Sequence, residues 1–415
     1  MKNRFIRALA ITVFALFLYR EAAESDILAS AFQEEIEECL EEGNLPVVML
    51  SQESGEYDFI GVPARWAAEY AVDQVNGAGG INGCDIRLIV GNTHSEKSRA
   101  LSLYEGAQRV SFLILGPVDA PETAYISSAK QNGENNAVHL AAYSYAESRQ
   151  EVAPFGISYM SDSEDGELEA VKVWAQQNPD ISDVVIFTMS EDESKKSTSA
   201  MFQDTFEDLG LHICEIIDVK SNAEKTDYQR YAIQALNQKA DGYVFLLSGE
   251  DYANILVELR KHGVEEGRRI SASFSSYVSD TIDIAKDALD GTYIWNKFDP
   301  LYEGEEWQEL LDTYDLENGR DELIGNSVAD YYDAVMAICT CYEELGVTDE
   351  NYRDFLDNPE VAQWFYNSGN LDGIQGDFYW SEGKKVMDYQ FFLFQGKKPV
   401  NQKNVLCHRK IRPMT

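Results

Sequence analysis

The stretch AAEYAVDQVNGAGGINGCDIRLIV, from Ala67 to Val90, contains the pattern that decides the fold. Its first half belongs to a run over residues 61–76 whose apolar side chains recur at helical spacing, at Val62, Trp66, Tyr70 and Val75. Its last residues, IRLIV, are β-branched and apolar and predict a strand. The glycines between them, at 77, 79, 80 and 83, follow a helix and precede a strand. This order favours a helix C-cap and a tight turn over a phosphate-binding loop, which would follow a strand.

The same alternation of strand and helix continues along the chain. Short apolar runs that predict strands begin at Pro46, Ile86, Phe112 and Ala137, and a second series begins at Phe155, Asp183, Ile213, Gly242, Arg269 and Gly291. Helix-length segments separate most of them, which predicts parallel sheets covered on both faces. The fold class is therefore α/β, with two doubly wound parallel-sheet lobes. Because such sheets bind ligands at the carboxyl ends of their strands, we expect a ligand cleft between the lobes.

The N-terminal segment has the features of an export signal. Lys2, Arg4 and Arg7 precede an apolar run of twelve residues, Ala8–Tyr19, which is too short to span a bilayer unaided. Residues 1–23 are thus predicted to be a signal peptide or a retained signal anchor. Residues 24–43 carry apolar side chains at a spacing of four and predict a leader helix. The expected location is periplasmic or cell-surface, with anchoring by the N-terminal segment left open.

Composition argues against several functions. The formal charge of -38 disfavours nucleic acid and anionic membranes as partners. Nucleophile-elbow, Walker and dinucleotide-binding motifs are absent from the sequence, so neither an enzyme nor a cofactor is expected. The six cysteines and five histidines are scattered without a Cys-x-x-Cys pair, and no metal site is expected.

Several segments together resemble a known family. Besides Ala67–Val90 they are GPVDAPETA from Gly116, ADGYVFLLSGEDYANILVELRKHG from Ala240 and G-x-x-G-x-F-Y-W-S-E-G from Gly373. In this order they resemble the type 1 periplasmic binding proteins, the leucine/isoleucine/valine-binding group of ABC transporter receptors, over nearly all of 44–400. The resemblance implies two lobes joined by hinge strands that close over a small solute, as in a Venus flytrap. It places lobe 1 at 44–152 and 300–375, lobe 2 and the hinge at 153–299 and 376–400, and a tail at 401–415.

The resemblance also implies a binding site, and here the sequence departs from it. In amino-acid-binding relatives a serine after the third strand and a small residue followed by threonine after the fourth hold the ligand carboxylate. These positions carry Ala120 and, after Ala142, Tyr143. The acidic partner of the ligand ammonium falls on Phe274 or Ser275, and a family tyrosine falls near Glu193. An ordinary α-amino acid is therefore disfavoured as the ligand.

A different pocket replaces the expected one. Its predicted members are aromatic walls, polar groups that orient the ligand, and carboxylates for a cationic or hydroxyl-rich group: Tyr57, Tyr143, Tyr145 and Phe274; Ser144, Ser248 and Ser275; Asp119, Asp162, Glu193 and Glu250. Each has a structural alternative. In so acidic a chain a loop carboxylate is more often solvated or a helix N-cap, and a loop aromatic more often packs within its own lobe.

The leading hypothesis is an extracytoplasmic solute-binding protein that captures a small polar or amino-acid-like solute by lobe closure and delivers it to an ABC permease. The alternative is a ligand-sensing domain that signals to a membrane receptor. An extracellular hydrolase on the same scaffold is less favoured. Only one histidine, His139, is predicted near the cleft mouth, and we interpret it as an ordinary strand residue.

Overall fold

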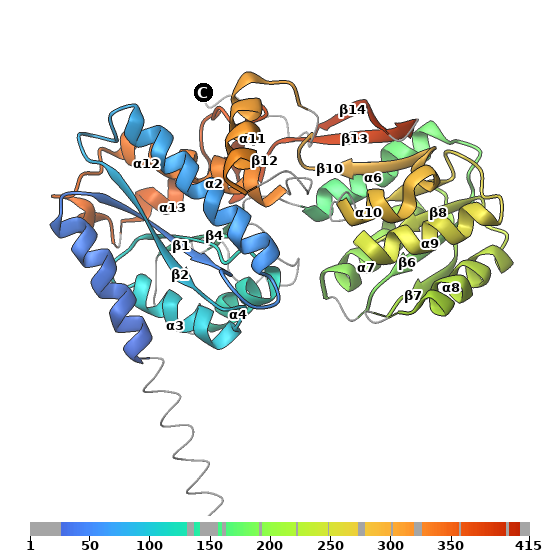
Figure 1. Cartoon of the computed structure of the whole chain (residues 1–415), viewed down its shortest axis with the longest axis horizontal. Helices are drawn as coiled ribbons and strands as arrows, with labels where there is room; N and C mark the ends of the chain where they lie inside the picture. The colour runs from blue at the N-terminus through green and yellow to red at the C-terminus, as the bar shows by residue number, and fades with distance from the viewer. Residues whose placement is uncertain are drawn as a thin grey trace, which may run out of the picture.

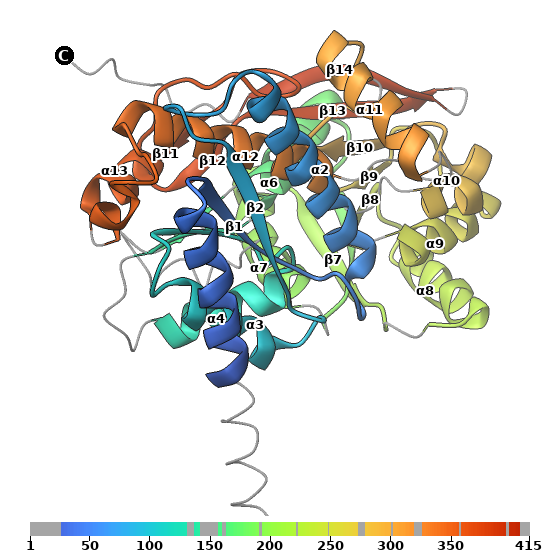
Figure 2. The same ribbon diagram turned by 60° about the vertical axis from the view of Figure 1, so that its left-hand side comes forward.

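The computed structural model describes residues 26–130, 137–141, 157–159, 163–190, 193–220, 223–247, 249–272, 279–299, 302–318, 326–356, 358–395 and 398–406. These residues form two lobes, each built on a seven-stranded sheet flanked by helices (Figures 1 and 2). The predicted fold class, two parallel α/β lobes, is confirmed.

The first sheet has the strand order β11-β12-β5-β4-β3-β1-β2. In chain order its strands are β1 (Leu45–Ser51), β2 (Ile86–Asn92), β3 (Leu113–Leu115), β4 (Val138–Ala141), β5 (Ile157–Tyr159), β11 (Tyr379–Ser381) and β12 (Lys384–Val386). All neighbours are parallel except β11 and β12. The helices of this half are α2 (Asp58–Gly77), α3 (Lys97–Ala107), α4 (Ala120–Lys130), α11 (Glu305–Asn318), α12 (Asn326–Leu345) and α13 (Pro359–Tyr366).

The second sheet has the strand order β14-β13-β10-β9-β8-β6-β7. Its strands are β6 (Asp183–Thr188), β7 (His212–Asp218), β8 (Gly242–Phe245), β9 (Arg269–Ser271), β10 (Thr292–Asn296), β13 (Asp388–Gln395) and β14 (Lys398–Leu406). Around it lie α6 (Ser163–Gln177), α7 (Glu193–Asp208), α8 (Lys225–Asn237), α9 (Gly249–Lys261) and α10 (Ser279–Ala285). β13 and β14 form an antiparallel hairpin on one edge.

Sheet membership corrects three of the predicted boundaries. β5 pairs with β4 in the first sheet, although residues 153–299 were assigned to lobe 2. β11 and β12 also belong to the first sheet, although residues 376–400 were assigned to the second lobe and hinge. β14 extends to Leu406, so the predicted tail at 401–415 begins with a strand. An apolar run shows that a strand forms, whereas its partner is chosen by packing between distant segments.

The glycine turn has the predicted structure. α2 ends at Gly77, and the backbone N–H of Gly80 donates to Val75 O at 3.0 Å. Gly80 has φ +69°, and a Cβ there would lie 2.2 Å from Cys84 O. Only glycine fits this position, because a side chain would meet both backbone strain and a backbone oxygen. The turn delivers the chain directly into β2.

The predicted leader helix forms over residues 26–41. Its apolar side chains Phe32, Ile36 and Cys39 are buried in a cluster with Val48 of β1 and Leu103 of α3. The helix is thus an integral layer of the first lobe. In the described residues no helix is both long and apolar enough to cross a membrane.

Two lysines and two aspartates are buried where the lobes join. Lys297 Nζ, just after β10, lies 3.2 Å from Asp330 Oδ2 in α12. Lys385 Nζ in β12 lies 2.7 Å from Asp333 Oδ2 and 3.7 Å from Asp330 Oδ1. All four side chains are at most 3% exposed. This junction network links the end of the second sheet to a helix of the first lobe.

Candidate functional site

Three helices begin where strands of the two sheets end. α4 starts at Ala120 after β3, α7 starts at Glu193 after β6, and α9 starts at Gly249 after β8. Because neighbouring strands are parallel, their carboxyl ends share one edge of each sheet. The sequence-predicted residues Ala120, Glu193 and Glu250 therefore stand at helix starts on these edges, as the strand–loop–helix pattern requires.

In the first lobe, Gln52 organises this edge. It directly follows β1, is fully buried, and its Nε2 donates to Glu122 Oε2 at 2.6 Å. Its Oε1 accepts from the Val118 backbone N–H at 3.2 Å. Gly61 allows α2 to approach closely, since a Cβ there would lie 2.2 Å from Gln52 O. One side chain thus ties the loop after β1 to the loop after β3.

Two buried carboxyl groups stand at the start of α4. Asp119 Oδ1 accepts from the Glu122 backbone N–H at 2.9 Å, so Asp119 acts as an N-cap, the structural alternative considered above. Desolvation raises the pKa of Asp119 to about 6. Desolvation, followed by the charge of Asp119, raises the pKa of Glu122 to about 7. This edge is acidic, poorly solvated and prepared to accept hydrogen bonds or a positive charge.

The loop after β1 presents aromatic rings. Tyr57 precedes α2, is half-buried, and its backbone N–H donates to Ser95 Oγ at 3.1 Å. Its ring lies 6.4 Å from that of Phe59, which is 67% exposed. Asn92 joins the same loop to the end of β2 by accepting from the Glu53 backbone N–H at 3.1 Å. The loop after β1 and the first turn of α2 thus carry one half-buried and one exposed aromatic ring.

Five of the twelve predicted ligand-site residues lie within the described ranges: Tyr57, Asp119, Ala120, Glu193 and Glu250. Glu250 is exposed in the first turn of α9. The other seven lie outside the described residues: Ala142, Tyr143, Ser144, Asp162, Ser248, Phe274 and Ser275. Their predicted roles remain predictions.

Sequence reasoning missed Gln52 and Glu122. Both were accessible in principle, because Gln52 follows the first predicted strand directly and Glu122 stands three residues after Asp119, for which a helix N-cap was the structural alternative. Nothing local indicates, however, that these polar side chains are buried. His139 lies in β4, fully buried, with Nε2 2.5 Å from Gly116 O and its ring against Tyr104. It is a core strand residue.

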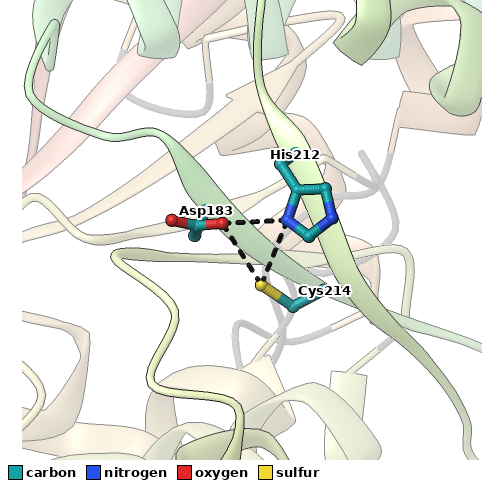
Figure 3. A group of neighbouring side chains, drawn as sticks. All are labelled: Asp183, His212 and Cys214. Carbon is teal, nitrogen blue, oxygen red and sulfur yellow. Dashed lines mark hydrogen bonds and ion pairs between the residues drawn. The ribbon is translucent and has the colours of Figure 1, made fainter.

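Away from this edge, three side chains able to ligate a metal come together. They are Asp183, His212 and Cys214, on β6 and β7 (Figure 3). No metal site was expected from the scattered histidines and cysteines of the sequence.

The sequence profile of the periplasmic binding protein family matches residues 45–399. The chain belongs to this family. A search of curated proteins gives no match. Solved structures similar to this periplasmic binding protein include the leucine binding protein LivK of Thermotoga maritima, with a TM-score of 0.67 at 17% identity, covering 86% of this chain and 98% of the other.

Two further structures have the same fold and contain a bound ligand. The branched-chain amino acid substrate binding protein LivJ of Streptococcus pneumoniae, in complex with isoleucine, has a TM-score of 0.66 at 15% identity and covers 86% of this chain and 100% of its own. A solute binding protein of Rhodopseudomonas palustris, in complex with 3,4-dihydroxybenzoic acid, has a TM-score of 0.68 at 13% identity, with coverages of 88% and 98%. These likenesses show the shared two-lobed fold, and the family match confirms the resemblance to periplasmic binding proteins.

Proposed function

We propose that this protein is an extracytoplasmic solute-binding protein of an ABC transporter, which captures a small polar solute between its lobes and presents it to a permease. Family membership over residues 45–399 supports the general role. The observation that carries the proposal is the pair of parallel sheets, each with helices starting at the carboxyl ends of its strands. A solute that contacts both edges only in the closed form stabilises that form by population shift.

The acidic edge of the first lobe narrows the class of solute. Isoleucine and 3,4-dihydroxybenzoic acid, the ligands of two similar structures, both carry a carboxylate. Here the position of the carboxylate-binding serine is Ala120, directly beside Asp119 and close to Glu122. A ligand carboxylate at this edge would meet like charge and lose a hydroxyl partner. We therefore expect a solute that presents a cationic or hydrogen-bond-donating group, such as an amine, amide or polyol.

The test is a thermal-shift screen of the chain from Glu24 onward against amino acids, amides, polyamines, sugars and small aromatic acids. A ligand at 100 times its dissociation constant adds about 2.7 kcal/mol of stability, a shift of a few degrees. Hits among amines, amides or polyols support the proposal. Micromolar binding of leucine, isoleucine or valine would refute the ligand class, and failure of every compound to shift the melting temperature would count against solute capture.

A matched pair of variants then locates the group that the acidic edge recognises. Glu122→Gln removes a buried carboxyl group, whereas Glu105→Gln removes an exposed one on α3 of the same lobe. For an amine ligand, affinity should fall in the first variant and stay unchanged in the second. Wild-type affinity should also rise between pH 6 and 7, because the raised pKa values of Asp119 and Glu122 keep them partly protonated below that range. Equal affinities of the two variants would exclude Glu122 from the site.

A further inference from the structure

We propose that Asp183, His212 and Cys214 form a binding site for one divalent cation of the zinc class at the edge of the second lobe. Figure 3 shows the three side chains converging from neighbouring strands. Asp183 Oδ1 lies 2.9 Å from His212 Nδ1, and Cys214 Sγ lies 3.6 Å from Asp183 Oδ1 and 3.7 Å from His212 Nδ1. A carboxylate, an imidazole and a thiolate are the three ligand types that zinc takes in proteins.

The backbone explains why these side chains meet. Asp183 and His212 are the first residues of β6 and β7 and are paired in the parallel register. The pairing then passes from Val184 opposite Ile213 to Val185 opposite Glu215, so Cys214 is an extra residue in β7. Such a β-bulge re-aims the side chain of the inserted residue. Here the bulge keeps the thiol beside the ligand atoms of the first pair.

The spacing of the ligand atoms fits tetrahedral zinc. With ordinary bond lengths, a tetrahedral ion separates its sulfur from an oxygen or nitrogen ligand by about 3.5 Å and its nitrogen from its oxygen by about 3.3 Å. The two sulfur distances of 3.6 and 3.7 Å therefore need almost no adjustment. The 2.9 Å between Asp183 and His212 is a direct hydrogen bond, which has to open by only about 0.4 Å to admit an ion.

A catalytic triad is the competing interpretation of the same three residue types. In a triad the nucleophile and the acid contact different nitrogens of the imidazole. Here Asp183 and Cys214 both contact Nδ1 of His212. The imidazole therefore does not connect a nucleophile on one nitrogen to an acid on the other. Three ligand atoms that lie close to one another around a common point are the arrangement found in metal sites.

Neighbouring groups hold the carboxylate ligand in place. Asp183 Oδ2 accepts from Ser182 Oγ at 3.2 Å. The backbone N–H of Asp183 donates to Asp241 Oδ2 at 3.2 Å, and the same oxygen accepts from Ser182 Oγ at 2.9 Å. Such outer contacts orient metal ligands and tune affinity. The His212 side chain is 74% exposed, which leaves the fourth position of the ion to water.

The site is separate from the proposed solute site. Asp183 and His212 begin their strands, so the cluster lies at the amino ends of β6 and β7, whereas the helices α7 and α9 start at the carboxyl ends. Metal binding and solute capture can therefore be measured independently, and failure of one leaves the other intact.

The experiment is a Co²⁺ titration of the full chain with reduced thiols, followed by competition with Zn²⁺. A thiolate–Co²⁺ charge-transfer band in the near ultraviolet, with visible bands typical of tetrahedral cobalt and one equivalent bound, is expected. Cys214→Ser should abolish the ultraviolet band. His212→Asn should weaken binding by more than the roughly 10- to 100-fold that loss of an outer-shell partner costs. The matched control, His262→Asn at an exposed histidine on the same lobe, should bind like the wild type.

Either of two results would overturn the proposal. Absence of the thiolate band in the wild-type protein excludes Cys214 as a ligand. A band that persists in Cys214→Ser assigns cobalt to another cysteine. The melting temperature of each variant without metal, compared with the wild type, shows that the second lobe is folded.

Discussion

Replacing Lys385 with methionine tests the junction network of Lys297, Asp330, Asp333 and Lys385. The substitution keeps most of the apolar stem of Lys385 and removes its ammonium group. Asp333 then loses its partner at 2.7 Å, and Asp330 retains only Lys297 at 3.2 Å. Burial already raises the pKa of Asp333, with Lys385 as the main opposing influence. Without Lys385, Asp333 must be ionised and unpaired or take up a proton.

The structure sets the size of the effect. Removing one partner of a buried ion pair typically costs about 3–5 kcal/mol. Lys385→Met should fall near the upper end, about 4–5 kcal/mol, because that lysine contacts both aspartates. Lys297→Met should cost about 3 kcal/mol, because Asp330 keeps Lys385 at 3.7 Å. The control Lys220→Met, in an exposed pair with Asp218, should cost about 1 kcal/mol or less.

Urea unfolding followed by circular dichroism and tryptophan fluorescence measures these differences. If the two lobes unfold in separate transitions, each transition is fitted independently. A single free energy of unfolding is not defined for a protein whose domains unfold separately. Adding Asp333→Leu to Lys385→Met should recover part of the lost stability, because it removes the stranded charge. The reasoning is refuted if Lys385→Met costs no more than Lys220→Met.

Two further predictions concern the acidic edge of the first lobe. Between about pH 4.5 and 7 the folded state keeps a proton on Glu122 that the unfolded chain releases, so this group's contribution to stability falls as pH rises. Relative to the wild type, Glu122→Gln should therefore gain stability over that window, by up to roughly 3 kcal/mol in parallel urea titrations; a constant difference contradicts the raised pKa. Gly61→Ala should lower the melting temperature although alanine favours helices, because its Cβ would lie 2.2 Å from Gln52 O. An unchanged or higher value would show that the loop yields freely.

The leader helix shows which structural features a local sequence pattern predicts and which it does not. Apolar residues at a spacing of four predict a helix ahead of the first strand, and one forms over residues 26–41. The same pattern leaves its partner undetermined. The leader helix packs closely on α3 because residue 106 is glycine. A Cβ on Gly106 would lie 2.3 Å from Ala29 O. Its docking depends on a small residue in a segment about 80 positions away.

β5 and the metal-ligand cluster illustrate what the pattern omits. The run around Ile157 predicts a strand, but the run does not indicate which sheet the strand joins. In the structure β5 pairs with β4 and so belongs to the first sheet. His212 and Cys214 are separated by one residue, while Asp183 lies some thirty positions earlier, so spacing gave no metal motif. The register of β6 against β7 brings them together, and a bulge keeps Cys214 in reach.

By itself, the sequence determined the two-lobed α/β architecture, the glycine turn after α2 and the resemblance to periplasmic binding proteins. These depend on side-chain period, turn residues and motifs, which are properties of contiguous residues. The tertiary structure alone decided which sheet each strand joins, that Glu122 is buried beside Asp119, and that Lys297 and Lys385 face Asp330 and Asp333. Strand pairing and desolvation depend on segments tens to hundreds of residues apart, and no local pattern encodes how closely such segments approach.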